Sequence, residues 1–202
     1  MSWYAISREL RPVTFGISRL NEMKGTGKQR NARFEVWGVN STLDSVDVNL
    51  TIEFYSISSG ARVSHVEQST SLLPNQSTEV WSETDYSSPD LLDTVISVLY
   101  SLPNGETMRS AANWPRPLKY IDFSNRELTF TVNGEEVSIT ADKPVRGVIL
   151  DIAGDDDSEL EWSDNGLDVM PGDMVKVTAK GLNGRTVKVN WYGNDFGSSI
   201  LE

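Results

Sequence analysis

Two short segments carry residue types that phosphate binding or acyl transfer would use. Residues 25–28 read GTGK, but a phosphate-binding loop needs a glycine where Glu22 stands and a serine or threonine where Gln29 stands. His65, the single histidine, could serve a serine nucleophile as a base. It lies in an alternating apolar and polar segment, however, and the chain contains no Gly-x-Ser-x-Gly elbow. We therefore expect an exposed loop at the first segment and a structural or solvent-facing histidine at the second.

Carboxylates are the next candidates, because a glycosidase needs two of them about 5 to 9 Å apart in a cleft. Glu135 and Glu136 instead flank a tight turn. An acidic loop carries three successive aspartates, Asp155, Asp156 and Asp157. Neither place favours the burial that would tune a pKa. The aspartates are a calcium candidate through their oxygen ligands, but they lack the spacing of an EF-hand loop, so the sequence favours a solvated charge run.

Tryptophan is the residue type here with potential for ligand binding, because a flat indole can stack on the apolar face of a sugar ring. Of the six tryptophans, Trp37 and Trp191 share faces with valines and are expected in a core. The candidates for carbohydrate binding are Trp81, Trp114 and Trp162. Three sequons make Asn40, Asn49 and Asn75 glycosylation candidates.

Composition excludes several classes of function. The chain has no cysteine, which rules out disulfides, thiolate nucleophiles and cysteine-ligated metals. Its net charge of −11 argues against nucleic acid or an anionic membrane as a partner. No apolar run reaches the length of about 18 residues that a membrane span needs, and we expect no leader at the charged N-terminus. The sequence predicts no cofactor and leaves the compartment open.

The elements that must position these residues are mostly β-strands. Segments rich in valine, threonine and aromatic residues alternate with clusters of glycine, asparagine, serine or proline. The expected strands of the first half are 13–20, 32–39, 46–57, 62–71, 78–82 and 94–101. Those of the second half are 129–132, 135–139, 145–152, 160–162, 175–179 and 187–191. Short helical turns are expected only near 4–10 and 89–93, with Ser88 as a cap and Pro89 in the first turn. This spacing predicts antiparallel sandwiches.

Asn-Gly pairs are strong hairpin signals, because type I′ turns need positive φ. Two of them lie in convincing hairpins. One joins 129–132 to 135–139 through Asn133-Gly134, and the other joins 175–179 to 187–191 across residues 181–184.

A domain boundary is expected near the proline pair Pro115 and Pro117. Up to Pro117 the chain has 10 basic and 13 acidic residues, a net of −3, whereas the remainder has 8 and 16, a net of −8. This shift in charge supports two β-rich modules.

Four segments resemble one known family: SWYAISRELRP (2–12), FEVWGVN (34–40), NWPRPLKYIDF (113–123) and ADKPVRGVIL (141–150). They are similar to β-mannosidases of glycoside hydrolase family 2, especially fungal ones, and the resemblance covers nearly the whole chain. It implies an all-β fold of two consecutive immunoglobulin-like sandwiches, as found after the catalytic barrel at the C-terminal end of that longer enzyme. The expected organisation is an exit segment from the missing barrel (1–9), a first sandwich (10–112), a linker (113–118), a second sandwich (119–200) and a cloning scar (201–202).

Members of that family remove terminal β-mannose with retention, through two glutamates in the barrel. Neither can be assigned here, because 202 residues fall short of the roughly 250 that a barrel needs. The resemblance therefore implies a fragment that is inactive alone and braces the barrel of the same parent chain. Two alternatives stay open. The first is a module that binds mannose-containing glycans through an exposed tryptophan, and the second is an interaction protein without a barrel.

Overall fold

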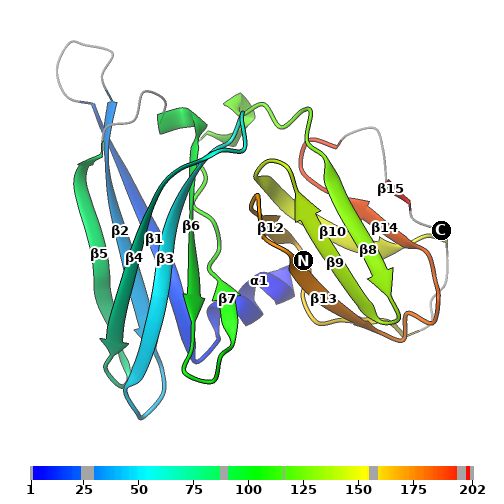
Figure 1. Cartoon of the computed structure of the whole chain (residues 1–202), viewed down its shortest axis with the longest axis horizontal. Helices are drawn as coiled ribbons and strands as arrows, with labels where there is room; N and C mark the ends of the chain where they lie inside the picture. Colours follow the sequence, from blue (N-terminus) through cyan, green and yellow to red (C-terminus); the bar gives the residue numbers. More distant parts are fainter. Residues whose placement is uncertain are drawn as a thin grey trace. The chain divides into compact units, whose positions relative to one another are not determined.

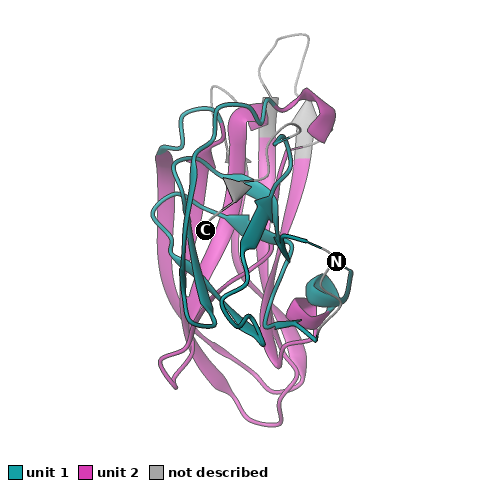
Figure 2. Ribbon diagram, turned by 90° about the vertical axis from the view of Figure 1, so that its right-hand side faces the viewer, with its two compact units in different colours: residues 1–6, 58–61, 122–202 teal, residues 7–57, 62–121 magenta. Residues whose placement is uncertain are grey.

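Each half of the chain folds around its own β-sheets. The computed structural model describes residues 2–23, 30–86, 91–115, 117–154, 159–194 and 199–200. It divides into two compact units, coloured separately in Figure 2. One unit comprises residues 7–57 and 62–121 and is called the first sandwich. The other comprises residues 1–6, 58–61 and 122–202 and is called the second sandwich.

One sheet of the first sandwich has three antiparallel strands in the order β1-β2-β5 (Figure 1). They are β1 (Val13–Met23), β2 (Arg30–Asn40) and β5 (Gln76–Tyr86). The hairpin of β1 and β2 runs without a shift of register from Val13 opposite Asn40 to Met23 opposite Arg30. Alternate residues of β2 are buried, as expected for a sheet with one face on a core.

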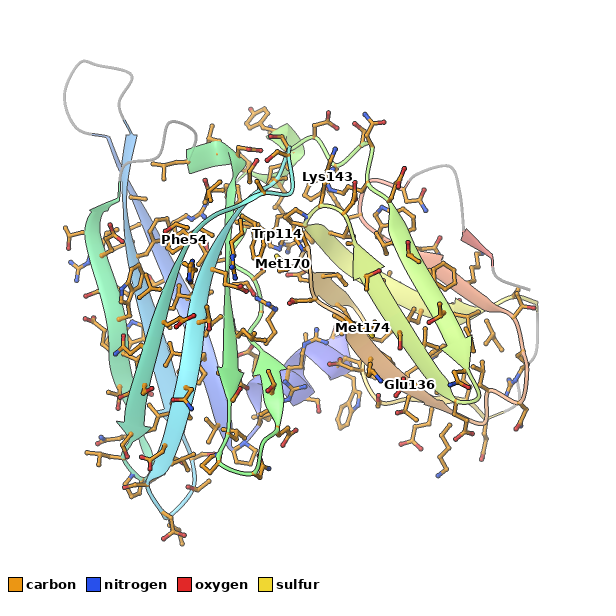
Figure 3. The ribbon with its side chains drawn as sticks, viewed as in Figure 1. Phe54, Trp114, Glu136, Lys143, Met170 and Met174 are labelled. Carbon is orange, nitrogen blue, oxygen red and sulfur yellow. The ribbon has the colours of Figure 1, made fainter. Side chains whose placement is uncertain are left out.

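The other sheet of the first sandwich has the order β4-β3-β6-β7. Its strands are β3 (Val46–Ser56), β4 (Arg62–Leu72), β6 (Thr94–Ser101) and β7 (Thr107–Arg109). Aromatic rings fill the core between the two sheets. Phe15 lies 4.7 Å from Tyr100 between ring centroids, and Phe34 meets Phe54, which is labelled in Figure 3, edge-on at 5.8 Å. These pairs contribute packing beyond the buried area alone.

A bulge in β5 changes which residues point inward. Val36 pairs with Trp81, whereas the next residue, Trp37, pairs with Glu79, so Val80 is the extra residue. Strict alternation would send Val80 and Trp81 to opposite faces, but both pack against the core of the first sandwich. The bulge therefore turns Trp81 inward while Glu79 stays on the outer face.

The second sandwich consists of two four-stranded sheets, in the orders β11-β13-β9-β8 and β12-β10-β14-β15. The first sheet contains β8 (Leu128–Asn133), β9 (Glu136–Ala141), β11 (Glu161–Trp162) and β13 (Val175–Lys180). The second contains β10 (Val145–Ile152), β12 (Leu167–Val169), β14 (Val187–Asn190) and β15 (Ser199–Ile200). Its core is mainly aliphatic, with Val137, Ile139, Val177 and Val189 fully buried.

One predicted hairpin is confirmed and the other is wrong. β8 and β9 pair, with Asn133 opposite Glu136 across the turn. β13, however, pairs with β9 and β11, whereas β14 pairs with β10 and β15, so these two strands lie in different sheets. Asn183 and Gly184 do adopt the expected positive φ, of 48° and 74°. The residues of this turn adopt the predicted conformation. The strands before and after it, β13 and β14, lie in the two different sheets of the sandwich instead of pairing with each other.

Helical structure is scarce among the described residues. The helix α1 (Ser2–Glu9) covers most of the helical turn expected at 4–10, and η1 (Leu91–Asp93) falls in the second expected turn. Ser88 and Pro89, proposed to cap that turn, lie outside the described residues. A further short turn, η2 (Leu118–Tyr120), was not predicted. None of the described helices is long and apolar enough to cross a membrane.

Candidate functional site

The three tryptophans proposed for carbohydrate binding are mostly enclosed. Trp81 is partly buried and meets Phe54 edge-on, with 6.1 Å between ring centroids. Trp114, labelled in Figure 3, is 4% exposed and follows Asn113, whose backbone pairs with Ile96 of β6. Trp162 is 9% exposed and packs in the core of the second sandwich. The surroundings of Trp81 and Trp162 favour a core role, and Trp162 belongs to a different sandwich from the other two.

The expectation that Trp37 lies in a core is wrong. Trp37 is 38% exposed, because its neighbours Val36 and Gly38 take the inward positions of β2. It shares the outer face with the partly buried Val39, whereas Val36 points into the core. Neighbouring valines therefore do not predict the face on which Trp37 lies. Trp191 does pack against the core of the second sandwich.

The glycosylation candidates differ sharply in their surroundings. Asn40 is fully buried, and its Nδ2 donates to the backbone oxygens of Asp44 at 2.8 Å and Leu72 at 3.0 Å. Its Oδ1 accepts from the backbone N–H and hydroxyl of Thr42. A glycan on Nδ2 would disrupt this network, so the folded chain offers no access there. Asn49 and Asn75 are exposed.

His65 and the carboxylates of the predicted turn are engaged in structural contacts. His65 is exposed on β4, as expected, with Nε2 at 4.0 Å from Oε1 of Glu67. Glu136 binds Nζ of Lys176 at 2.8 Å, and this hydrogen bond, ahead of the opposing burial, lowers the pKa of Glu136. Glu135 accepts from the backbone N–H of Gly181 at 2.7 Å. Residues 25–28 and Asp155 to Asp157, the calcium candidate, lie outside the described residues.

A buried charged cluster that the sequence did not predict lies in the sheet of β3, β4, β6 and β7. Glu53 of β3 accepts from Nη1 of Arg62 at 2.9 Å through one carboxylate oxygen and from Nη1 of Arg109 at 2.8 Å through the other. The same nitrogen of Arg109 donates to Oγ of Ser97, 2.8 Å away. The glutamate side chain is 5% exposed, against 13% for Arg109 and 48% for Arg62.

The electrostatics of this cluster keep Glu53 ionised. Burial raises the pKa of Glu53, but the charge of Arg109 and hydrogen bonds from Arg62, Arg109 and Tyr55 outweigh it and lower the pKa below its usual value. A carboxyl held in this state cannot act as a proton donor at neutral pH. The cluster is therefore suited to fixing four strands together rather than to catalysis.

A depression of about 510 Å³, with both polar and apolar lining, lies on the outer face of the same sheet. Its lining includes Asp47, Asn49, Ser69 and Ser101. Asn49 already accepts a hydrogen bond from Ser69, at 2.6 Å. The depression has hydroxyl, amide and carboxylate groups but no aromatic ring in its lining. Among the residues that the structure describes, no group of three histidine or acidic side chains is placed to hold a metal ion.

The fold and these contacts define a class of protein: a pair of tandem immunoglobulin-like β-sandwiches whose charged groups serve structure. Residues 32–120 match a family described as the mannosidase Ig/CBM-like domain, and residues 123–190 match an Ig-fold domain family of mannosidases. The chain therefore carries mannosidase-type immunoglobulin-like domains, and the resemblance seen in its sequence is confirmed.

Curated relatives point to the same group. Beta-mannosidase B of Aspergillus clavatus is 30% identical over 196 residues, which cover 90% of this chain and 22% of the relative. Beta-mannosidase B of Emericella nidulans is 28% identical over 200 residues, with the same two coverages. The chain thus spans less than a quarter of the length of these relatives.

Solved structures confirm the fold. The β-D-mannosidase of Dictyoglomus thermophilum superposes with a TM-score of 0.70 at 16% identity, over 95% of this chain and 23% of that protein. The exo-chitosanase of Amycolatopsis orientalis gives 0.55 at 12% identity, over 99% of this chain and 27% of that protein. At such identities the likeness concerns architecture alone.

Proposed function

We propose that this chain is the non-catalytic, immunoglobulin-like part of a family 2 β-mannosidase that hydrolyses terminal β-D-mannose residues with retention. Its role is to support the catalytic barrel of the same parent chain. The observation that carries the proposal is the pattern of coverage: fungal β-mannosidases align with 90% of this chain but with only 22% of their own length.

The described side chains support a non-catalytic role. A retaining glycosidase needs one carboxyl that can give up a proton and a second that attacks the sugar, about 5 Å away. Glu53 is buried and held ionised by two arginines, and Glu136 is bound to Lys176. Neither is free for that chemistry.

An exposed apolar stripe on α1 supports contact with another part of the parent. Trp3 and Ile6 of α1, together with Leu10 directly after its end, recur at helical spacing and are all exposed, Trp3 by 72%. Tyr4, on another side of the same helix, packs against the core of the second sandwich. An apolar stripe left in water on an anchored helix is typical of a surface that a partner covers.

Activity measurements test this proposal. The isolated chain should release no product from an aryl β-mannoside, whereas the full-length parent should. Removing the segment from the parent should lower its melting temperature and its yield of active enzyme. Hydrolysis by the isolated chain after removal of host enzymes, or a truncated parent with unchanged melting temperature and activity, would contradict the proposal.

A second candidate function is recognition of manno-oligosaccharides through an exposed tryptophan. Trp81, Trp114 and Trp162, the residues first considered for it, are partly or largely buried. The observation that favours this function is the exposure of Trp37 on the outer face of a sheet.

A further inference from the structure

The outer face of the sheet β1-β2-β5 presents one row of three residues with complementary properties. Gly16 of β1 pairs directly with Trp37 of β2, which pairs directly with Glu79 of β5. The indole therefore has a residue without a side chain on one flank and a carboxylate on the other. We call these three residues the Trp37 row.

The indole of Trp37 is held at one edge. Its Nε1–H donates to Oε2 of Glu35, two residues back on the same strand and face, at 3.3 Å. Glu35 is in turn held by Nη2 of Arg33 at 2.8 Å through its other oxygen. A ring fixed by a hydrogen bond loses less side-chain entropy when it binds a ligand.

Open space lies beside the ring at Gly16. A Cβ built on Gly16 would meet no heavy atom within 4 Å, and the backbone there does not need the positive φ that favours glycine. Gly38 of β2 is different, since its Cβ would come within 2.8 Å of Leu72 and 3.0 Å of Phe15 in the core. Core packing thus explains why residue 38 is a glycine, but it does not explain the glycine at position 16. Because Gly16 has no side chain, the outer face beside Trp37 stays uncovered.

Polar groups surround the Trp37 row on the same face. The adjacent cross-strand rows place hydroxyl groups around it, from Thr14, Ser18, Ser77 and Ser82. Glu79 is exposed and forms no ion pair or hydrogen bond with another described residue. Hydroxyls and carboxylates are natural partners for sugar hydroxyls, and the acidic groups disfavour anionic saccharides.

We propose that the Trp37 row is a binding site for a neutral hexopyranose unit of an oligosaccharide. The apolar C–H face of the sugar ring stacks on the indole above Gly16, and Glu79 and the surrounding hydroxyls bind the equatorial groups. This activity goes beyond the bracing role and does not depend on it, because the isolated chain contains the whole row.

The test is a titration of the isolated chain with mannohexaose and, separately, cellohexaose, followed by the indole and amide signals in proton–nitrogen NMR. Saturable shifts that include the Trp37 indole signal are expected, with a millimolar dissociation constant. Trp37→Ala and Gly16→Val should each weaken binding at least tenfold, the second because a branched side chain fills the space beside the ring. Trp3→Ala removes another exposed tryptophan and should leave binding unchanged.

Two variants keep the test decisive if one of them misfolds. Gly16→Val places a strand-favouring residue on an open face and should fold at least as well as the unmodified chain. Absence of saturable shifts with both sugars at 20 mM would overturn the proposal. So would binding that survives Gly16→Val and Trp37→Ala, or binding that Trp3→Ala abolishes.

Discussion

At the residue scale, Glu53 couples the stability of the first sandwich to pH. Its folded pKa lies below the ordinary value of 4.5, because the arginines around it outweigh the effect of burial. A carboxyl with a lowered folded pKa contributes stability above its unfolded pKa, and this contribution is lost as the pH falls through the folded pKa. The relevant window therefore lies below about pH 4.5.

Replacing Glu53 by glutamine should reveal this contribution. At pH 7 the change leaves the largely buried Arg109 without its countercharge and should cost about 3 to 5 kcal/mol in the free energy of unfolding. The difference between the two proteins should shrink as the pH drops below 4.5, because the carboxyl is protonated first in the unfolded chain and, at lower pH, in the folded chain. Urea unfolding of both proteins between pH 7 and pH 3 measures this difference in the free energy of unfolding.

The exposed pair of Glu136 and Lys176 provides a matched control. Glu136→Gln should cost no more than about 1 kcal/mol at pH 7, because surface ion pairs contribute little. A penalty for Glu53→Gln that stays constant from pH 7 to pH 3 would show that the missing interaction is not the ionised carboxylate.

The cluster around Glu53 also shows which contacts could not be predicted from the sequence pattern. Glu53 stands in an apolar stretch of β3, which signals a buried charge, but its arginine partners come from other strands, at positions 62 and 109, and Ser97 joins the cluster through Arg109. Only the register of β3 against β4 and β6, and of β6 against β7, brings them together. The alternation of apolar and polar residues predicted that these segments are strands, but it could not predict which charged side chains would contact one another.

At the element scale, the faces of the strands were harder to predict than their positions. Every expected strand has a counterpart in the structure, because β-branched and aromatic residues separated by turn residues are a local signal. Whether a residue points inward depends on long-range features. The bulge at Val80 turned Trp81 inward, and core packing placed β13 and β14 in different sheets. Trp37 was assigned to the wrong side of its sheet, and Trp81, a candidate for carbohydrate binding, packs against the core.

The two glycines of the first hairpin should respond oppositely to alanine. Gly38→Ala drives a methyl group against Leu72 and Phe15 in the core and should lower the free energy of unfolding by about 1 to 3 kcal/mol. Gly16→Ala adds a methyl group in open space and should raise it by about 0.5 to 1 kcal/mol, because glycine is unfavourable within a strand. Chemical denaturation compares the two variants directly. Equal effects would contradict the assignment of inner and outer faces on β1 and β2.

At the scale of the whole molecule, the apolar stripe of α1 should govern self-association. Without a covering partner, the isolated chain should form larger species as its concentration rises, because Trp3, Ile6 and Leu10 are exposed. Replacing all three by glutamine, a good helix former, should keep the chain monomeric in light scattering with its melting temperature changed by only a few degrees.

Leu43→Gln is the control for this experiment, since Leu43 is 88% exposed but lies outside α1. It should leave association unchanged. If the unmodified chain stays strictly monomeric, the apolar stripe no longer supports the proposal that this chain docks onto the rest of a parent enzyme.

The order of strands also determines when each sandwich can form during synthesis. The first sandwich takes its described strands from residues 13–109, so its sheets are complete before the second half of the chain is made. In the second sandwich, β9 pairs with β13 and β10 pairs with β14, so both sheets wait for residues 175–190. On the ribosome, β9 and β10 must therefore emerge and remain without β13 and β14 until residues 175–190 have been made.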